Sequence, residues 1–229
     1  MGGSHSNREL PFVGPGPRRS VPVIAKERLK SPRARLFVAL DLPDEVREGL
    51  ARWQGRELGD PALRPIRPEA LHVTLCFLSY QPEKQIDRIT EIVQGMEPRP
   101  VGLRFEPEPA PRPKGRPRLY ALDAESPAAI AVQAELSDAL EANRFYEPEK
   151  RPFWPHMTVA RVRSERLPPK PGQRRGKGRP KRVREPPGEL PKALQRPFGA
   201  VRVALYRSNL RPQGAEYVRL AEIDLPPPG

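Results

Sequence analysis

Apolar and polar residues alternate with regular periods along the central and C-terminal parts of this chain. Residues 35–40 form a short apolar run that is typical of a buried strand. Pro43 and the acidic residues after it predict the start of a helix, and Val46, Leu50 and Trp53 then lie on one face of that helix. The first predicted unit is therefore a strand followed by a helix.

The same kinds of pattern continue to residue 224. They predict strands at residues 71–77, 100–105, 118–122, 153–162, 199–206 and 215–224, and helices at residues 82–94 and 127–142. Gly95 suits the C-terminal cap of the first of these helices, and residues 106–117 form a proline-rich loop. Mixed strands and helices with long connections between strands predict an α+β or α/β fold.

Two segments depart from this pattern in composition and charge. Of the formal net charge of +13, residues 1–34 contribute +5 (seven basic, two acidic) and residues 164–192 contribute +7 (ten basic, three acidic), which leaves +1 for the rest. Both segments are rich in proline and show no periodicity that would bury a face. We therefore predict a disordered basic N-terminal extension at 1–34, a domain at 35–225 interrupted by a disordered basic loop at 164–192, and a tail at 226–229.

The composition also excludes several classes of protein. A single cysteine excludes a disulfide framework, no apolar run is long enough to span a bilayer, and residues 1–30 lack the apolar stretch of a signal peptide. We therefore expect a soluble cytoplasmic protein with no membrane partner. A monomer is the default expectation, since the sequence does not give the oligomeric state.

The most specific signal is a repeated pair of histidine and threonine. The chain has three histidines and three threonines, and His72 with Thr74 and His156 with Thr158 form two His-x-Thr pairs on predicted strands, 84 residues apart (156 − 72). Positions i and i+2 of a strand project from the same face, so each pair presents an imidazole beside a hydroxyl. We expect two similar lobes that face one another and bring both pairs around one central space.

Two imidazoles and two hydroxyls around one space suit phosphoryl chemistry without a metal. An in-line displacement at phosphorus needs a base on the attacking side and an acid on the leaving side, and two imidazoles supply both near neutral pH. The hydroxyls donate to phosphate oxygens. Two alternatives stay open: each pair is a half-buried strand face whose polar groups satisfy one another, or the histidines hold zinc. Zinc would need further ligands, and Cys76 is more often a small core residue than a ligand or a nucleophile.

Four stretches carry a resemblance to a known family, namely residues 35–40, 71–78, 151–161 and 208–217. They are similar to the 2H phosphoesterase superfamily and, within it, to the bacterial and archaeal RNA 2′,3′-cyclic phosphodiesterases, first described as 2′-5′ RNA ligases. The resemblance implies an α+β fold of two pseudo-symmetric lobes of antiparallel sheet, with helices on the outside and a central cleft. It also implies hydrolysis of an RNA 2′,3′-cyclic phosphate end to a 2′-phosphate, with no metal and no cofactor.

The resemblance further implies a role for five residues. His72 matches the proton donor, His156 matches the proton acceptor, and Thr74 and Thr158 match hydroxyls that bind phosphate. Arg161 matches an arginine that also contacts the phosphate, but it lies five residues after His156, and strand parity places it on the opposite face. Its role needs a bulge or twist after Thr158; otherwise it is a solvated arginine at a strand end.

Three other residues near these motifs bear on substrate contacts. Trp154 and Tyr80 are candidates for stacking on a terminal base, with core packing as the alternative for each. Ser79 stands where the family commonly has glycine.

Three functions follow from these observations. The first is the RNA 2′,3′-cyclic phosphodiesterase. The second uses the same residues on another cyclic nucleotide or in the reverse 2′-5′ joining of RNA. The third is a non-catalytic RNA-binding protein that acts through its basic segments, although a binding protein does not need a matched acid and base. The basic loop either extends the contact with a polyanionic RNA or has no role.

Overall fold

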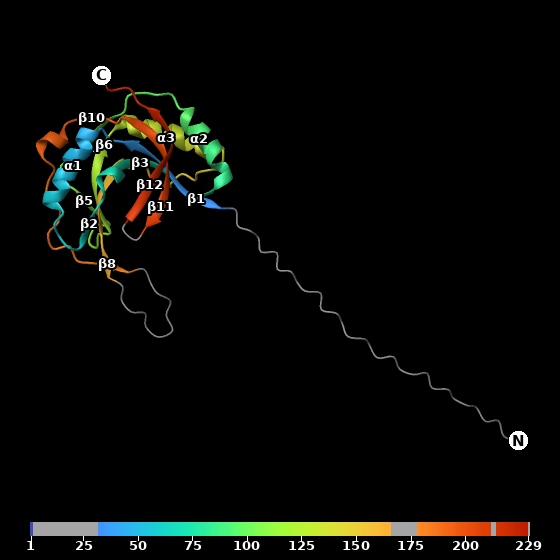
Figure 1. The fold of residues 1–229 in the computed structure, drawn as a ribbon, viewed down its shortest axis with the longest axis horizontal. Coiled ribbons are helices and arrows are strands. Elements are labelled where there is room, and N and C mark those ends of the chain that lie inside the picture. The colour runs from blue at the N-terminus through green and yellow to red at the C-terminus, as the bar shows by residue number, and fades with distance from the viewer. Residues whose placement is uncertain (2–31, 166–177, 212–213, 229) are drawn as a thin grey trace. The chain divides into compact units, whose positions relative to one another are not determined.

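Strand β1 (Arg33–Asp41) carries the first apolar run and lies inside a four-stranded sheet. The structure is a computed structural model that describes residues 1, 32–165, 178–211 and 214–228 (Figure 1). β1 pairs with β3 (His72–Pro82) and with β11 (Arg202–Arg211), and β11 pairs with β12 (Gly214–Asp224). All these pairings are antiparallel, in the order β12-β11-β1-β3.

The first sheet holds His72 and Thr74 in β3, and a second antiparallel sheet holds His156 and Thr158. Its strands follow the order β10-β4-β6-β7-β2, and β5 also pairs with β6. Their bounds are Leu63–Pro65 (β2), Gly102–Phe105 (β4), Ala110–Arg112 (β5), Leu119–Glu125 (β6), His156–Val162 (β7) and Phe198–Gly199 (β10). β8 (Ser164–Glu165) and β9 (Arg179–Pro180) form a separate two-stranded ribbon. Two antiparallel sheets with helices between their strands in the chain confirm the predicted α+β fold.

Three helices pack against these sheets. α1 (Asp44–Glu57) lies against the second sheet, where Gln54 donates from Nε2 to the carbonyl of Val159 in β7 at 2.9 Å. α2 (Ile86–Gln94) and α3 (Pro127–Ala142) pack on the first sheet. In Figure 1, α1 lies on one flank of the strands and α2 and α3 lie on the other. Short 3-10 turns occur at Pro68–Ala70, Glu83–Gln85 and Lys192–Gln195.

Local sequence signals explain where the helices begin and end. Ser126 caps α3, since its hydroxyl accepts the backbone N–H of Ala129 at 3.0 Å and Pro127 occupies the first turn. Gly95 ends α2, as predicted, and donates its N–H to the carbonyl of Glu91 at 2.9 Å. The predicted start of α2 at residue 82 is early, because a 3-10 turn precedes the helix.

The core is built from the predicted apolar stripes. Val38 and Leu40 of β1 and Leu50 and Trp53 of α1 are all fully buried. The indole N–H of Trp53 donates to the carbonyl of Glu189 at 3.0 Å, so α1 also holds part of the chain that follows β9. Burial of apolar side chains throughout the core supplies most of the favourable free energy of folding.

Residues 178–192 differ from the disordered loop that their composition predicted. Asp60 accepts the backbone N–H groups of Arg184 and Glu185 at 2.6 and 3.0 Å, and its side chain is buried. Such long-range hydrogen bonds leave no periodic trace in the sequence, which explains why the stretch resembled a disordered one. Residues 166–177 of the predicted loop lie outside the described residues.

The ends of the chain and one loop also bear on the predictions. Residues 2–31 of the predicted extension lie outside the described residues, whereas the last two residues of that extension already belong to β1. The predicted loop at 106–117 contains β5, and residues 226–228 are in neither a helix nor a strand. None of the described helices is long and apolar enough to cross a membrane.

Candidate active site

The two His-x-Thr pairs begin β3 and β7, and these two strands lie next to each other. Each strand has a bulge directly after its threonine. In β3, Thr74 and Cys76 pair with adjacent residues of β1, which leaves Leu75 without a partner. In β7, Thr158 and Ala160 pair with adjacent residues of β6, so the residue between them is the extra one. A bulge of this kind reverses the facing of the residues that follow it.

The bulge in β7 places Arg161 where strand parity alone would not. Arg161 lines the same pocket as His156 and Thr158, so the bulge or twist that its role requires is present after Thr158. The equivalent position in β3, 84 residues earlier (161 − 84), is Phe77, whose side chain is 51% exposed. The two sheets therefore present an arginine in β7 and a phenylalanine in β3 at matching positions.

A small pocket brings both pairs together. It is lined by Ile66, Ala70, His72, Thr74, His156, Thr158, Arg161 and Tyr217, and its volume is ≈ 40 Å³. Two imidazoles, two hydroxyls and one guanidinium thus surround one space. Tyr217 of β12 was not singled out by the sequence patterns, because only the pairing of β12 with β11 brings it to the pocket.

Each histidine is fixed by the backbone two residues before it. The Nδ1 atom of His72 lies 2.8 Å from the carbonyl oxygen of Ala70, and the Nδ1 atom of His156 lies 2.8 Å from that of Trp154. A carbonyl only accepts, so Nδ1 carries the proton and donates it in both contacts. This leaves Nε2 of each neutral ring as a base with no bond to the backbone.

The His72 ring is held by aromatic side chains of the first sheet. Phe37 stacks on it with ring centroids 4.8 Å apart, and Tyr206 stacks on the other side of Phe37 at 5.3 Å. Tyr217 packs its ring edge-on against His72 at 5.3 Å. The three aromatic rings restrict rotation of the imidazole.

The His156 ring is held by a different stack. The indole of Trp154 lies parallel to it, with centroids 3.7 Å apart and an angle of 11°. The guanidinium of Arg112 lies over the indole, 4.6 Å from the ring centroid, and is paired with Asp123 at 3.0 Å. The indole contacts both His156 and Arg112, so Trp154 supports the His156 ring, and stacking of a terminal base on Trp154 stays a prediction.

Tyr80, the other stacking candidate, lies outside this pocket. Its side chain is 52% exposed and lines a separate hollow near Arg35 and Arg207. Stacking of a base on Tyr80 stays a prediction. Ser79, beside it, has a φ of +57°, which explains why glycine suits this position.

Burial lowers the pKa of both pocket histidines. The pKa of His72 falls to about 4, mainly through burial and further through the charges of His156, Arg47 and Arg161, while its hydrogen bond to Ala70 acts in the opposite direction. The pKa of His156 is also lowered, again mainly by burial. In the free protein both rings are therefore mainly neutral at pH 7.

Asp123 acts on His156 in the opposite direction from burial. Its carboxylate favours the charged imidazole and limits the fall in the pKa of His156. Cys76 is a poor candidate for a nucleophile, since burial raises the pKa of its thiol to about 12.

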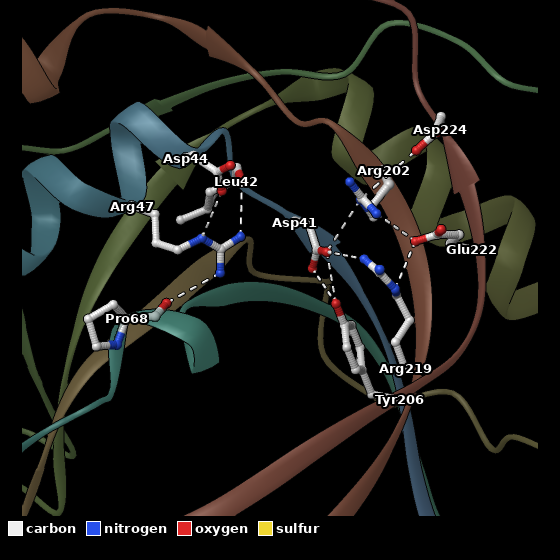
Figure 2. Close-up of polar contacts among 10 residues, drawn as sticks. All are labelled: Asp41, Leu42, Asp44, Arg47, Pro68, Arg202, Tyr206, Arg219, Glu222 and Asp224. Carbon is white, nitrogen blue, oxygen red and sulfur yellow. Dashed lines mark hydrogen bonds and ion pairs between the residues drawn. The ribbon is translucent and has the colours of Figure 1, made fainter.

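A network of charged groups supports the first sheet beside the pocket (Figure 2). Asp41, which pairs with His72 in register, accepts the hydroxyl of Tyr206 through both carboxylate oxygens at 2.8 Å. Arg202 and Arg219 lie 3.6 and 3.9 Å from the same carboxylate. Burial raises the pKa of Asp41, whereas the Tyr206 hydroxyl and the arginines lower it. The network holds Tyr206, and through Tyr206 the stack on His72.

Arg47 connects α1 to the turn that orients His72. Its guanidinium donates to the carbonyls of Leu42 and Pro68 at 3.1 and 3.3 Å, as Figure 2 shows. Pro68 begins the turn whose last residue, Ala70, accepts the His72 N–H. Within the described residues, no three His, Cys, Asp or Glu side chains lie close enough together to hold a metal ion.

Comparison with known proteins identifies similar chains. A sequence model of the family described as the 2′-5′ RNA ligase superfamily matches residues 42–170. The RNA 2′,3′-cyclic phosphodiesterase of Thermus thermophilus is 29% identical over 203 residues, which cover 83% of this chain and 90% of the relative. The RNA 2′,3′-cyclic phosphodiesterase of Archaeoglobus fulgidus is 32% identical over 136 residues, covering 56% and 73%.

Solved structures show a similar fold. The crystal structure of TT0787 of Thermus thermophilus matches with a TM-score of 0.66 and 27% identity, over 83% of this chain and 97% of that one. The crystal structure of E. coli LigT complexed with 3′-AMP matches with a TM-score of 0.62 and 22% identity, over 85% and 99%. The second likeness concerns the fold alone.

Proposed function

The chain belongs to the 2′-5′ RNA ligase superfamily, and we propose that it hydrolyses the 2′,3′-cyclic phosphate end of an RNA to a 2′-phosphate. The observation that carries this proposal is the single pocket that holds both His-x-Thr pairs and Arg161. The names of its relatives, RNA 2′,3′-cyclic phosphodiesterases, supply the substrate class.

The pocket contains a group for each step of an in-line displacement. Nε2 of His156 takes a proton from a water molecule, whose oxygen attacks the phosphorus. The bond from phosphorus to O3′ breaks, and Nε2 of His72 gives a proton to the departing O3′. The product is a 2′-phosphate and a free 3′-hydroxyl, and the proton balance is kept because one histidine gains the proton that the other loses.

The remaining pocket residues act on the phosphate itself. The hydroxyls of Thr74 and Thr158 and the guanidinium of Arg161 are donors aimed at one space. Negative charge builds on the phosphate oxygens in the transition state, and fixed donors stabilise that charge. Phe77, exposed beside the His72 stack, offers an apolar surface for the terminal base.

The fixed tautomers support these roles of the two Nε2 atoms as proton acceptor and proton donor. Each Nδ1 is committed to a carbonyl, so only Nε2 exchanges a proton with substrate. The stacks keep the rings from turning away from the phosphate.

A digest of a short RNA with a 2′,3′-cyclic phosphate end, run with a chelator, tests the proposal. We expect conversion to the 2′-phosphate by the wild type and a loss of at least about 1,000-fold in kcat for His72→Ala and His156→Ala. Thr90→Ala, on α2 and outside the pocket, is the matched control for Thr74→Ala and Thr158→Ala.

Two results would contradict the proposal. Binding of RNA by the wild type without turnover would favour the non-catalytic RNA-binding protein. Full turnover by either histidine variant would show that the chemistry does not use the pocket as described.

A further inference from the structure

A second and much larger pocket lies at the end of the second sheet. Its volume is ≈ 640 Å³, against ≈ 40 Å³ for the pocket with the histidines. One wall is the connection between β5 and β6, which contributes Arg116. The other wall is the β8–β9 ribbon and the residues after it, which contribute Arg179, Lys181 and Arg182. We call this hollow the basic pocket.

The basic pocket has an excess of positive charge that the described residues do not neutralise. Four cationic side chains line it against one carboxylate, Glu165. Many other arginines of the fold, such as Arg104 and Arg202, are paired with carboxylates. Among the described residues, the side chains of the four cations of the basic pocket make no hydrogen bond or ion pair.

The backbone that carries these cations is well anchored. Lys181 donates its N–H to the carbonyl of Arg163 at 2.8 Å, directly after β7. Asp60 holds the next residues through the N–H groups of Arg184 and Glu185. A backbone that is already anchored loses little conformational freedom when an anion binds to the side chains that it carries.

The walls of the basic pocket contain no exposed aromatic surface among the described residues. Tyr120, the aromatic residue in its lining, is only 5% exposed. Bases of a single strand bind mainly by stacking on aromatic side chains, whereas phosphates bind to cations. The chemistry of the pocket therefore selects the phosphates of a nucleic acid, with little dependence on base sequence.

We call the small pocket that holds His72 and His156 the catalytic pocket. The basic pocket is connected to it through β7 and the β5–β6 hairpin. Glu165 follows Arg161 by four positions, a path of about 13 Å at the rise of an extended strand. Arg112 and Pro111 are neighbours on β5 and face opposite sides of it. Arg112 packs on Trp154 at the catalytic side, whereas Pro111 lines the basic pocket. An RNA chain that occupies both pockets therefore passes the tip of the β5–β6 hairpin, where Arg116 lies.

We propose that the basic pocket binds backbone phosphates of the substrate RNA several nucleotides away from its cyclic end, so that long RNAs are preferred over short ones. This inference rests on the proposed function. We expect a dinucleotide to gain nothing from the basic pocket, because it has no phosphate several nucleotides away from its cyclic end.

A charge-matched pair of variants tests this inference. The first is the triple variant Arg179→Gln, Lys181→Gln and Arg182→Gln. The control is Arg52→Gln, Arg56→Gln and Arg196→Gln, which removes the same net charge from a different hollow, beside α1. Both are compared with the wild type on a cyclic-phosphate dinucleotide and on a 20-nucleotide RNA with the same end, over a range of salt concentrations.

The first variant should lose activity only on the long substrate. Three phosphate contacts to a single strand correspond to a change of about 2 in the slope of log affinity against log salt, and to a loss of about 10- to 100-fold in kcat/KM near 0.1 M salt. The control variant should stay within about twofold of the wild type on both substrates. Arg116→Gln should show a smaller loss of the same kind.

Three results overturn the inference. These are an unchanged kcat/KM on the 20-nucleotide RNA, an equal loss in the control variant, and an equal loss on the dinucleotide. Failure of the proposed function is a separate outcome, because it appears as no turnover of the dinucleotide by the wild type. In that case fluorescence anisotropy with a 20-nucleotide RNA still tests the basic pocket, and equal binding by the two triple variants overturns it. Thermal unfolding checks that both variants are folded.

Discussion

Binding of an anion in the catalytic pocket should raise the pKa of His72 by about three units. In the free protein this pKa is about 4, because the ring is removed from water and lies near Arg47, Arg161 and His156. Only about one molecule in 1,000 then carries a proton on His72 Nε2 at pH 7. A group with so low a pKa holds almost no proton to donate at pH 7. We therefore expect the negative charge of the bound substrate to raise the pKa of His72.

The size of the effect follows from Coulomb's law for an anion in contact with the ring. A single negative charge about 4 Å from the imidazole, at an effective dielectric constant of about 20, stabilises the charged ring by about 4 kcal/mol. One pKa unit corresponds to about 1.36 kcal/mol, so the pKa rises by about three units, to about 7. About half of the His72 rings in the complex are then protonated at neutral pH.

The sign of the linked pH dependence can be checked independently. The bound pKa lies above the free pKa, so binding takes up a proton between about pH 4 and about pH 7. Affinity for the anion therefore rises as the pH falls through this window and becomes constant below about pH 4. Sulfate is a suitable probe because it stays fully ionised over the titration.

Nuclear magnetic resonance titration of the histidine rings measures the shift. The chain has three histidines, so His72→Asn and His156→Asn variants suffice to assign the pocket signals. We expect the His72 signal to titrate near pH 4 without sulfate and at or above pH 7 with it, because sulfate carries two negative charges. A His72 pKa that stays near 4 at saturating sulfate would refute both the distance assumed here and the role of His72 as the donor.

Three further predictions concern residues around the pocket. Trp154→Ala should lower kcat by about 10- to 100-fold with little change in KM, because His156 loses the ring that positions it. Trp154→Phe should restore most of the activity. Equal kcat for all three proteins in steady-state kinetics would show that the stack does not position His156. Asp60→Ala leaves three backbone N–H groups without their acceptor and should lower the free energy of unfolding by about 1–3 kcal/mol, measured with a chemical denaturant. Hydrogen exchange at residues 178–192 should become faster, and unchanged exchange there would show that Asp60 does not hold this segment. Cys76→Ala should keep turnover and the wild type should resist iodoacetamide, since the thiol pKa is about 12; rapid inactivation would show that the thiol is reactive.

The elements with strong local signals were the easiest to predict. The helix expected at residues 127–142 has those bounds in the structure, because Ser126 and Pro127 define its start within a few residues of sequence. The predicted strand at 35–40 is the centre of β1 for a similar reason, since its apolar run is buried on both sides. Boundaries shift where a 3-10 turn precedes a helix, as at α2, or where pairing extends a strand, as at β1.

What the sequence determined by itself is the residue types of the candidate site and the facing of each pair, because the two-residue period of a strand is a local property of the backbone. The repeat of His72 and Thr74 at His156 and Thr158 carries that information without any contact. Only the tertiary structure decided that Arg161 turns into the pocket, since the bulge after Thr158 depends on how β7 pairs with β6. The stack of Arg112 on Trp154 and the order of residues 178–192 around Asp60 likewise arise from contacts between distant parts of the chain, and no local pattern of residues records such contacts.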